Sequence, residues 1–265
     1  QIFDQVAGEP SLDTVEACRA VITANSFDVV VGLGGGSAMD TAKASACLAK
    51  NSGAAGQYFG SNLIPNRGLP LILIPTTAGT ASEVTPNSIF ADLSVNVKKG
   101  IVSPYLLPAV ALIDPELTYS CPPAVTAASG MDALVHAIES YISLGATPLT
   151  QGNALKAIEL ISGHLRRAVQ DGRDAAAREA MAWGSLIAGL SFANAGVGGV
   201  HALAYPLGGA YHVSHGVSNA LLLAPVMEFS APAKPALFAD IARAFGVKDA
   251  GQSAAEMTTL AVQAM

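Results

Sequence analysis

Charged residues, blocks of like charge and long apolar runs are all scarce in this chain of 265 residues. Only 13% of the residues are charged, and the formal net charge is −6. A weakly acidic chain lacks the basic surface that nucleic acids and anionic membranes attract, so we expect neither as a partner. No run of 18 apolar residues occurs, so the sequence predicts no membrane-spanning helix, and we recognise no signal peptide.

Cysteine is equally sparse. The three cysteines, Cys18, Cys47 and Cys121, are widely spaced and form no Cys-x-x-Cys pair. Such a set argues against a disulfide framework and against a thiolate zinc site, and it favours a reducing, cytoplasmic location. What the chain has in abundance is apolar residues, at 51%, enough for a large core in one or two domains.

The first part of the chain alternates strand and helix patterns. The continuous apolar run at residues 27–33 predicts a strand of a parallel sheet that is covered on both faces. We also expect helices over 11–25 and 37–50, strands over 69–74 and 109–113, and a hairpin of residues 84–91 and 97–103 around Leu93 and Ser94.

From Pro122 onward the pattern is helical throughout. We expect helices over residues 122–142, 150–169, 174–195, 216–229, 234–245 and 251–264. The sequence thus predicts an α/β domain over 1–118 and an all-helical domain over 119–265, with a ligand cleft between them. The chain opens on Gln1 and stops inside an expected helix, so we also expect a fragment that lacks both ends.

A glycine-rich turn follows the first predicted strand. Gly34, Gly35, Gly36 and Ser37 lead directly into a helix, where free backbone N–H groups and the helix dipole favour a phosphate. Ser37 is a candidate both for capping that helix and for donating to a phosphate oxygen. The turn matches neither the usual dinucleotide fingerprint nor a Walker A loop. A tight turn without a ligand is the alternative.

A hydroxyl-rich loop, residues 75–83, leaves the second predicted strand. Ligands of open α/β sheets bind beyond the carboxyl ends of the strands, where this loop and the glycine turn both lie. The loop thus favours a nucleotide site, although threonine, serine and glycine are also ordinary loop residues.

Asp132 and His136 point to a different chemistry. Their spacing of four residues places both on one helix face, among apolar neighbours that predict burial. A buried carboxylate needs a cationic, hydrogen-bonding or metal partner. His201 and His215 follow, separated by helix breakers that allow both rings to meet over one point. One carboxylate and three imidazoles suit Fe²⁺, Zn²⁺, Mn²⁺, Co²⁺ or Ni²⁺. The alternative is an Asp–His pair with unrelated loop histidines.

Taken together, four motifs resemble those of the iron-containing (group III) alcohol dehydrogenases, in the family's order. They are GGGSAMDTAK at 34–43, PTTAGTASEVT at 75–85, GMDALVHAIE at 130–139 and HGVSNA at 215–220. The resemblance implies a dehydroquinate synthase-like fold, with an α/β Rossmann-like N-terminal domain and an all-helical C-terminal domain. It also implies a metal, Fe²⁺ or Zn²⁺, together with NAD or NADP, and a homodimer.

The resemblance also implies roles for individual residues. The family's metal ligands match Asp132, His136, His201 and His215. Its nucleotide contacts match Gly35, Gly36, Ser37, Thr76, Thr77 and Thr80, with Asp40 added from the same helix. Its lysine near the nicotinamide ribose matches Lys98, with Lys99 as the second choice. Where many members carry a proton-relaying histidine, this chain has Tyr205; Tyr205 and the nearby His212 are therefore the candidate catalytic residues.

The predicted function is hydride transfer between NAD(P) and a small-molecule alcohol, aldehyde or ketone. Related alternatives are a hydroxyacid–oxoacid transhydrogenase and a reductase of maleylacetate or lactaldehyde. More distant ones are a metal-dependent lyase like dehydroquinate synthase, a glycerol dehydrogenase and a non-catalytic nucleotide-binding protein. The Asp132–His136 pair favours the alcohol dehydrogenase branch over the lyase and the glycerol dehydrogenase.

Overall fold

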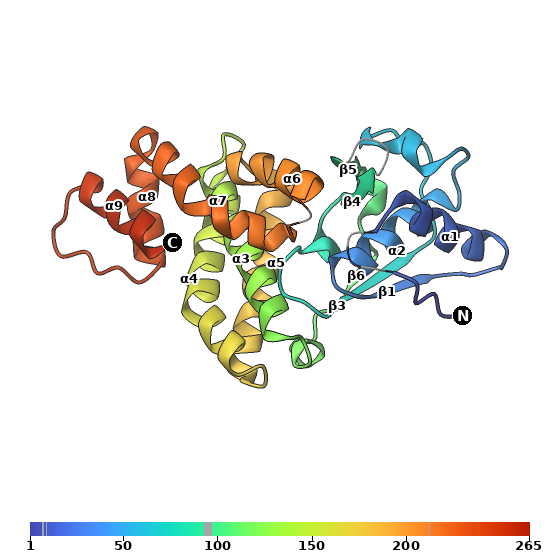
Figure 1. Cartoon of the computed structure of the whole chain (residues 1–265), viewed down its shortest axis with the longest axis horizontal. Helices are drawn as coiled ribbons and strands as arrows, with labels where there is room; N and C mark the ends of the chain where they lie inside the picture. Colours follow the sequence, from blue (N-terminus) through green and yellow to red (C-terminus); the bar gives the residue numbers. More distant parts are fainter. Residues whose placement is uncertain (7, 9, 93–96, 212) are drawn as a thin grey trace. The chain divides into compact units, whose positions relative to one another are not determined.

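The computed structural model describes residues 1–6, 8, 10–92, 97–211 and 213–265. It divides into two compact units, which are described separately (Figure 1). Unit 1 comprises Gln1–Thr77 and Ala81–Leu117, and unit 2 comprises Ala78–Thr80 and Thr118–Met265. The short piece Ala78–Thr80 thus leaves a strand of unit 1 but packs within unit 2.

In its described residues, unit 1 contains two small sheets and two α-helices. The parallel sheet has the order β1-β3-β6, with β1 (Val30–Gly34), β3 (Leu71–Pro75) and β6 (Val110–Ala111). The second sheet has the order β2-β5-β4, with β2 (Gly60–Ser61), β5 (Val97–Val102) and β4 (Asn87–Asp92). β4 and β5 form the predicted antiparallel hairpin, whose turn around Leu93 and Ser94 lies outside the described residues. The helices are α1 (Leu12–Thr23) and α2 (Gly36–Leu48).

Helix α2 packs directly on the parallel sheet because β1 carries a glycine at the contact. A Cβ atom on Gly32 would lie 2.6 Å from Leu73 Cδ2 and 2.8 Å from Ala42 Cβ, so only glycine permits this approach. The opposite face of β1 is not covered in the described part of the chain. Val31 and Leu33 are 53% and 59% exposed. The prediction of a strand buried on both faces is therefore wrong for β1, because alternate residues face opposite sides and only one side meets a helix.

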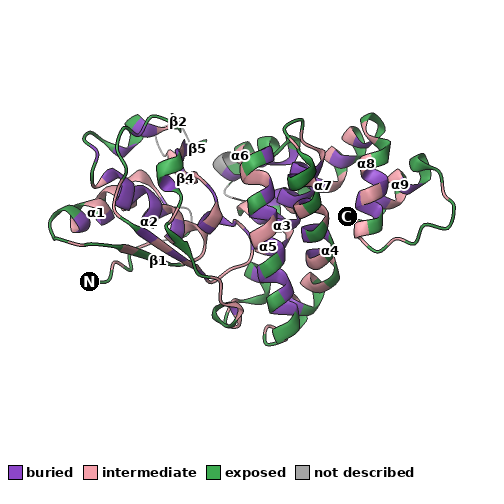
Figure 2. Cartoon of the chain, turned by 180° about the vertical axis from the view of Figure 1, so that it is seen from behind, coloured by how far each residue is buried: buried purple, intermediate pink, exposed green. Residues whose placement is uncertain are grey.

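Unit 2 is helical, and α3 runs through its core. The helices are α3 (Pro123–Ile142), α4 (Pro148–Gln170), α5 (Ala175–Ala195), α6 (Gly199–Tyr211), α7 (His215–Ser230), α8 (Pro235–Ala244) and α9 (Ala254–Ala264). Along α3, residues 132–141 are all buried. Figure 2 colours the chain by burial. Local capping sets several helix starts. Thr147 and Ser253 form capping boxes with Thr150 and Glu256.

Helix α6 was not expected. Pro206, Gly208 and Gly209 are the helix breakers expected between His201 and His215, yet α6 continues through Pro206. Proline inside a helix removes one backbone hydrogen bond, so the cost must be offset by packing. Val200 and Ala204, one turn apart on α6, are fully buried and provide that packing. Tertiary contacts thus override the local preference.

Among the described residues, no single helix has the length and apolar composition needed to cross a membrane. One bent pair, Ala175–Ala195 with Gly199–Gly208, meets the length and composition requirement jointly, across a bend of 102°.

Candidate metal centre

The centre is built on α3, which carries Asp132 and His136 on adjacent turns of one face. Both side chains are buried, with His136 Nδ1 3.9 Å from Asp132 Oδ2. The His136 ring is fixed by stacking. It lies nearly parallel to the Phe192 ring of α5, with the two ring centroids 4.0 Å apart, and it also stacks on the His201 ring, with the centroids 4.4 Å apart. The helix and two neighbouring rings therefore hold the first pair in place.

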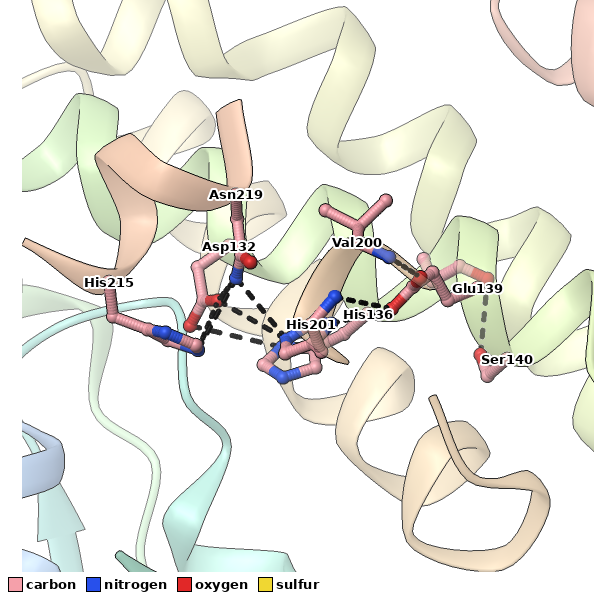
Figure 3. Close-up of polar contacts among 9 residues, drawn as sticks. Asp132, His136, Glu139, Ser140, Val200, His201, His215 and Asn219 are labelled. Carbon is pink, nitrogen blue, oxygen red and sulfur yellow. Dashed lines mark hydrogen bonds and ion pairs between the residues drawn. The ribbon is translucent and has the colours of Figure 1, made fainter. Parts of the chain in front are cut away.

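His201 and His215 complete the group, from α6 and the first residue of α7. The Nε2 atom of His201 lies 3.7 Å from Asp132 Oδ1, and that of His215 lies 3.5 Å from the same oxygen. Donor atoms of Asp132, His136 and His201 all lie within 4.8 Å of one another. Figure 3 shows the side chains converging from three helices. The structure thus brings together all four residues proposed as ligands.

The donor set fits a divalent metal by chemistry and by spacing. Two ligands bound at about 2.1 Å with a tetrahedral angle lie roughly 3.4 Å apart, close to the separations of His201 and His215 from Asp132. Within the described residues, the buried Nδ1 atom of His136 has no hydrogen-bond partner, which would be costly without a ligand. These features support a cation at this point.

The pKa values of the buried groups are strongly shifted. Burial alone would raise the pKa of Asp132, but the neighbouring His136, His215 and His201 outweigh it and hold the pKa well below its usual range. Burial, followed by repulsion from the other imidazoles, lowers the pKa of His136 to about 3. Burial also opposes charge on His201, yet hydrogen bonds to Asp132 and Glu139 raise its pKa to about 9. The site therefore combines an ionised carboxylate with a neutral imidazole at His136.

Glu139 is a further residue of this cluster, and it is not among the residues predicted from the sequence. It lies two turns after Asp132 on α3 and is 1% exposed. Its Oε2 atom is 2.6 Å from His201 Nδ1, and its Oε1 atom accepts the backbone N–H of Val200 at 2.6 Å. A carboxylate in this place keeps the proton on Nδ1 of His201, so that Nε2 is the atom that can bind a metal once the metal displaces the second proton. The i, i+4, i+7 spacing of the three α3 residues was the available signal.

Asn219 is the second residue that was missed. It lies one turn after His215 on α7 and is fully buried. Its Nδ2 atom donates to Asp132 Oδ1 at 2.6 Å and lies 3.2 and 3.3 Å from the Nε2 atoms of His201 and His215 (Figure 3). The amide therefore orients the carboxylate that all three histidines face. Its spacing from His215 repeats that of Asp132 and His136, but an asparagine in a helix carries little signal alone.

The two candidate catalytic residues differ in what the structure shows. Tyr205 on α6 stacks on His215, with ring centroids 5.5 Å apart and planes 14° from parallel. The position of Tyr205 therefore places a phenol beside a proposed ligand. His212 lies outside the described residues.

The proposed nucleotide residues lie mainly in unit 1. The glycine turn and the hydroxyl loop meet, because Thr76 N donates to Gly34 O at 2.9 Å and a Cβ atom on Gly35 would lie 3.5 Å from the Thr77 side chain. Thr80 groups with unit 2. The prediction that Ser37 caps α2 is wrong. The helix starts at Gly36, so the N-cap is Gly35, which has no side chain.

The remaining residues of that set have different surroundings. Both carboxylate oxygens of Asp40 accept hydrogen bonds within unit 1, from Ser82 Oγ and from Ile89 N. These contacts favour a supporting role over direct contact with a nucleotide. Lys98 lies half-buried on β5 opposite Ala91. The second choice, Lys99, pairs with Asp92 at 2.8 Å at the surface.

Comparison with known proteins decides the family. The model of the iron-containing alcohol dehydrogenases matches residues 1–115, and that of the C-terminal part of the same family matches residues 126–265. The chain belongs to the iron-containing alcohol dehydrogenase family. This membership confirms both the resemblance and the predicted combination of an α/β part with a helical part.

Individual family members show how far the likeness extends. Long-chain-alcohol dehydrogenase 1 of Geobacillus thermodenitrificans (strain NG80-2) is 50% identical over 249 residues, which are 92% of this chain and 62% of the relative. A crystal structure of 1,3-propanediol oxidoreductase is 43% identical with a TM-score of 0.96, over 100% of this chain and 69% of that one. Sulfoacetaldehyde reductase from Bifidobacterium kashiwanohense, solved in complex with NAD⁺, is 37% identical with a TM-score of 0.89, over 100% and 70%. The chain thus spans less than two thirds of the Geobacillus relative.

Proposed function

We propose that the protein is a metal-dependent, NAD(P)-linked oxidoreductase that transfers hydride between the nicotinamide and a small primary or secondary alcohol, aldehyde or ketone. The observation that carries the proposal is the convergence of Asp132, His136, His201 and His215 in unit 2. The family's iron and the NAD⁺ bound to one relative support the same choice of cofactors. Fe²⁺ is the proposed metal, with Zn²⁺ as the alternative.

Each ligand has a defined part in this proposal. When bound, the metal supplies a Lewis acid for the substrate oxygen, and the nicotinamide supplies or accepts the hydride. Asp132 provides the negative charge that offsets a divalent ion, and Asn219 orients that carboxylate. Glu139 holds His201 in the tautomer that can act as a ligand. These contacts fix the ligands in position before any substrate arrives.

Oxidation of an alcohol releases a proton as well as a hydride, so the site needs a route for that proton. Tyr205 has a phenolic hydroxyl that can donate and accept a proton through hydrogen bonds, and its ring lies against His215. We propose Tyr205 as the relay, with His212 as a second candidate. Tyrosine in place of histidine is also the feature that keeps hydroxyacid–oxoacid transhydrogenase activity as an alternative.

The nucleotide is proposed to bind at the turn between β1 and α2. Gly35, Gly36 and Ser37 would receive the pyrophosphate at the helix N-terminus. The hydroxyl groups of Thr76, Thr77 and Thr80 and the ammonium of Lys98 would contact the rest of the nucleotide. A homodimer and a cytoplasmic location also remain proposals, the latter supported by the free thiols of all three cysteines.

Removing single ligands tests the function. In the full-length protein, His201→Ala and His215→Ala should each abolish bound metal and turnover together, since three ligands leave the ion poorly held. Metal content is measured by elemental analysis, and turnover is followed by nicotinamide absorbance with a panel of alcohols and carbonyls. His164→Ala is the matched control, because the His164 ring hydrogen-bonds Leu160 O on its own helix and is not among the four proposed ligands.

Two outcomes would alter the assignment. Turnover that survives in a metal-free His201→Ala protein would end it. Hydride exchange between a hydroxyacid and an oxoacid, with no free nucleotide turned over, would instead establish the transhydrogenase alternative.

A further inference from the structure

A buried charged cluster in unit 1 takes no direct part in the proposed chemistry. Lys43 of α2 is fully buried, at 0% exposure. Its Nζ atom donates to Ser82 O at 2.9 Å, to Ser82 Oγ at 3.1 Å, to Thr85 Oγ1 at 3.4 Å and to Asn87 O. Asp40, one turn earlier, lies 3.7 Å from the same ammonium. Four of these contacts therefore join α2 to one segment, residues 82–87.

Full burial of a lysine side chain is energetically unfavourable, so the position of Lys43 calls for an explanation. Lysine is almost never fully buried unless it is paired, because removal of the ammonium from water is strongly unfavourable. Here burial lowers the pKa of Lys43 to about 8, although the negative charges of Asp40 and Glu83 oppose the shift. Those two carboxyls are the charged groups facing it, Asp40 from α2 and Glu83 from the short 3-10 helix η2 (Ser82–Val84).

The segment that Lys43 holds, residues 82–87, overlaps the end of the hydroxyl loop, residues 75–83. Ala81, just before η2, has a left-handed backbone with φ 49° and is buried. A residue other than glycine is strained in that conformation, so the surrounding contacts must impose it. Ser82 Oγ accepts a hydrogen bond from Lys43 and donates one to Asp40 Oδ1 at 2.5 Å. These two bonds hold the residue that follows Ala81 in place.

Helix α2 also contacts the hydroxyl loop at its N-terminus, through the glycine turn. α2 begins at Gly36, and the turn before it accepts the N–H of Thr76. One helix therefore anchors the hydroxyl loop at both ends, through the glycine turn and through Lys43. The loop of residues 75–83 is thus held at Thr76, next to the glycine turn, and again at Ser82.

We propose that Lys43 is a positioning residue for nicotinamide nucleotide binding, which clamps residues 82–87 onto α2 and so holds the hydroxyl loop against the glycine turn. The proposal rests on the proposed function, because it assumes a nucleotide at this turn. It assigns Asp40 and Ser82 to the same clamp and gives none of the three direct contact with the nucleotide.

The test compares Lys43→Met with Lys50→Met in the full-length protein. Lys50 follows α2 and is exposed, so it controls for the loss of one positive charge. Affinity for NADH and for NADPH is measured by fluorescence titration, and bound metal by elemental analysis. We expect Lys43→Met to weaken binding of the preferred nucleotide at least tenfold, with KM for that nucleotide raised, kcat near normal and metal content unchanged. Lys50→Met should match the wild type.

A pH series separates this role from general destabilisation. Wild-type nucleotide affinity should fall as pH rises through about 8, where the ammonium loses the charge that pairs with Asp40 and Glu83. Lys43→Met should show no such step. If Lys43→Met does not fold, Ser82→Ala decides the question. It removes the hydroxyl between Lys43 and Asp40 and should weaken binding about threefold or more.

The outcomes distinguish the two proposals. A wild-type protein that binds neither NADH nor NADPH removes the proposed function itself. Wild-type binding that is retained unchanged in Lys43→Met, or in Ser82→Ala when the former does not fold, overturns the clamp and leaves the function standing.

Discussion

Glu139 shows how a single side chain serves both a helix and a metal ligand. Its carboxylate accepts N–H groups from the first turn of α6, at Val200 and His201, and it also accepts from the His201 ring. A negative charge at a helix N-terminus is favourable, and here it comes from a different helix, α3. Burial would raise the pKa of Glu139, but the hydrogen bond and charge of the His201 ring, together with backbone hydrogen bonds from Gly198 and Val200, lower it below its ordinary value. The carboxylate is thus ionised where the ligand needs an acceptor.

Replacing this charge should weaken the metal site without removing a ligand. In Glu139→Gln the side chain keeps one acceptor oxygen, but its NH₂ group faces backbone donors and the charge is lost. Loss of such an outer partner typically costs 10–100-fold in metal affinity, and we expect a decrease of that order. Competition with a chelator measures it, and the absorption spectrum of the Co²⁺-loaded protein reports the altered geometry. Glu159→Gln, at an exposed pair with Lys156, is the control; equal affinity in both variants would disprove the role.

At the scale of elements, the site depends on how closely α7 approaches α3. Gly216, next to His215, has no side chain to separate them. A Cβ atom there would lie 2.1 Å from the backbone oxygen of Ala128, one turn before Asp132. Since a backbone oxygen in a helix cannot move aside, only glycine allows His215 to reach Asp132.

Gly216→Ala should therefore push the start of α7 outward. Overpacking of a tight contact costs about 1–3 kcal/mol of unfolding free energy, and we expect a loss in that range together with weaker metal binding. Urea unfolding gives the first quantity and chelator competition the second. Gly163→Ala is the matched control, because a Cβ atom on Gly163 in α4 meets nothing within 4 Å. That change should instead stabilise the helix by up to about 1 kcal/mol. Normal metal affinity in Gly216→Ala would show that α7 is not held in this way.

The sequence predicted the elements whose periodicity is local and missed what depends on distant contacts. The helix that carries Asp132 and the helix that follows the glycine turn lie where the apolar spacing puts them. Helix α6 was missed because Pro206 argues against it locally, whereas burial of Val200 favours it only in the fold. Glu139 and Asn219 were present in the recognised motifs, but nothing in the spacing shows that they touch His201 and Asp132.

At the scale of the whole molecule, the residues proposed to bind the metal lie in one unit, and most of those proposed to bind the nucleotide lie in the other. All four proposed metal ligands lie on α3, α6 and α7 of unit 2. The glycine turn, Thr76 and Thr77 lie in unit 1, whereas residues 78–80 of the hydroxyl loop group with unit 2. Because a ligand stabilises the structure that binds it, metal and nucleotide should act on separate parts of the chain.

Hydrogen exchange followed by mass spectrometry tests this division in the full-length protein. Saturating Fe²⁺ under anaerobic conditions, or Zn²⁺, should slow exchange in peptides of α3, α6 and α7, since a ligand at 1,000 times its Kd stabilises the bound state by about 4 kcal/mol. NADH should slow exchange around residues 34–37 and 76–80. His201→Ala is the decisive control, because it should abolish metal protection and leave protection by NADH intact. Metal protection confined to unit 1, or surviving in His201→Ala, would place the ion elsewhere and contradict the site.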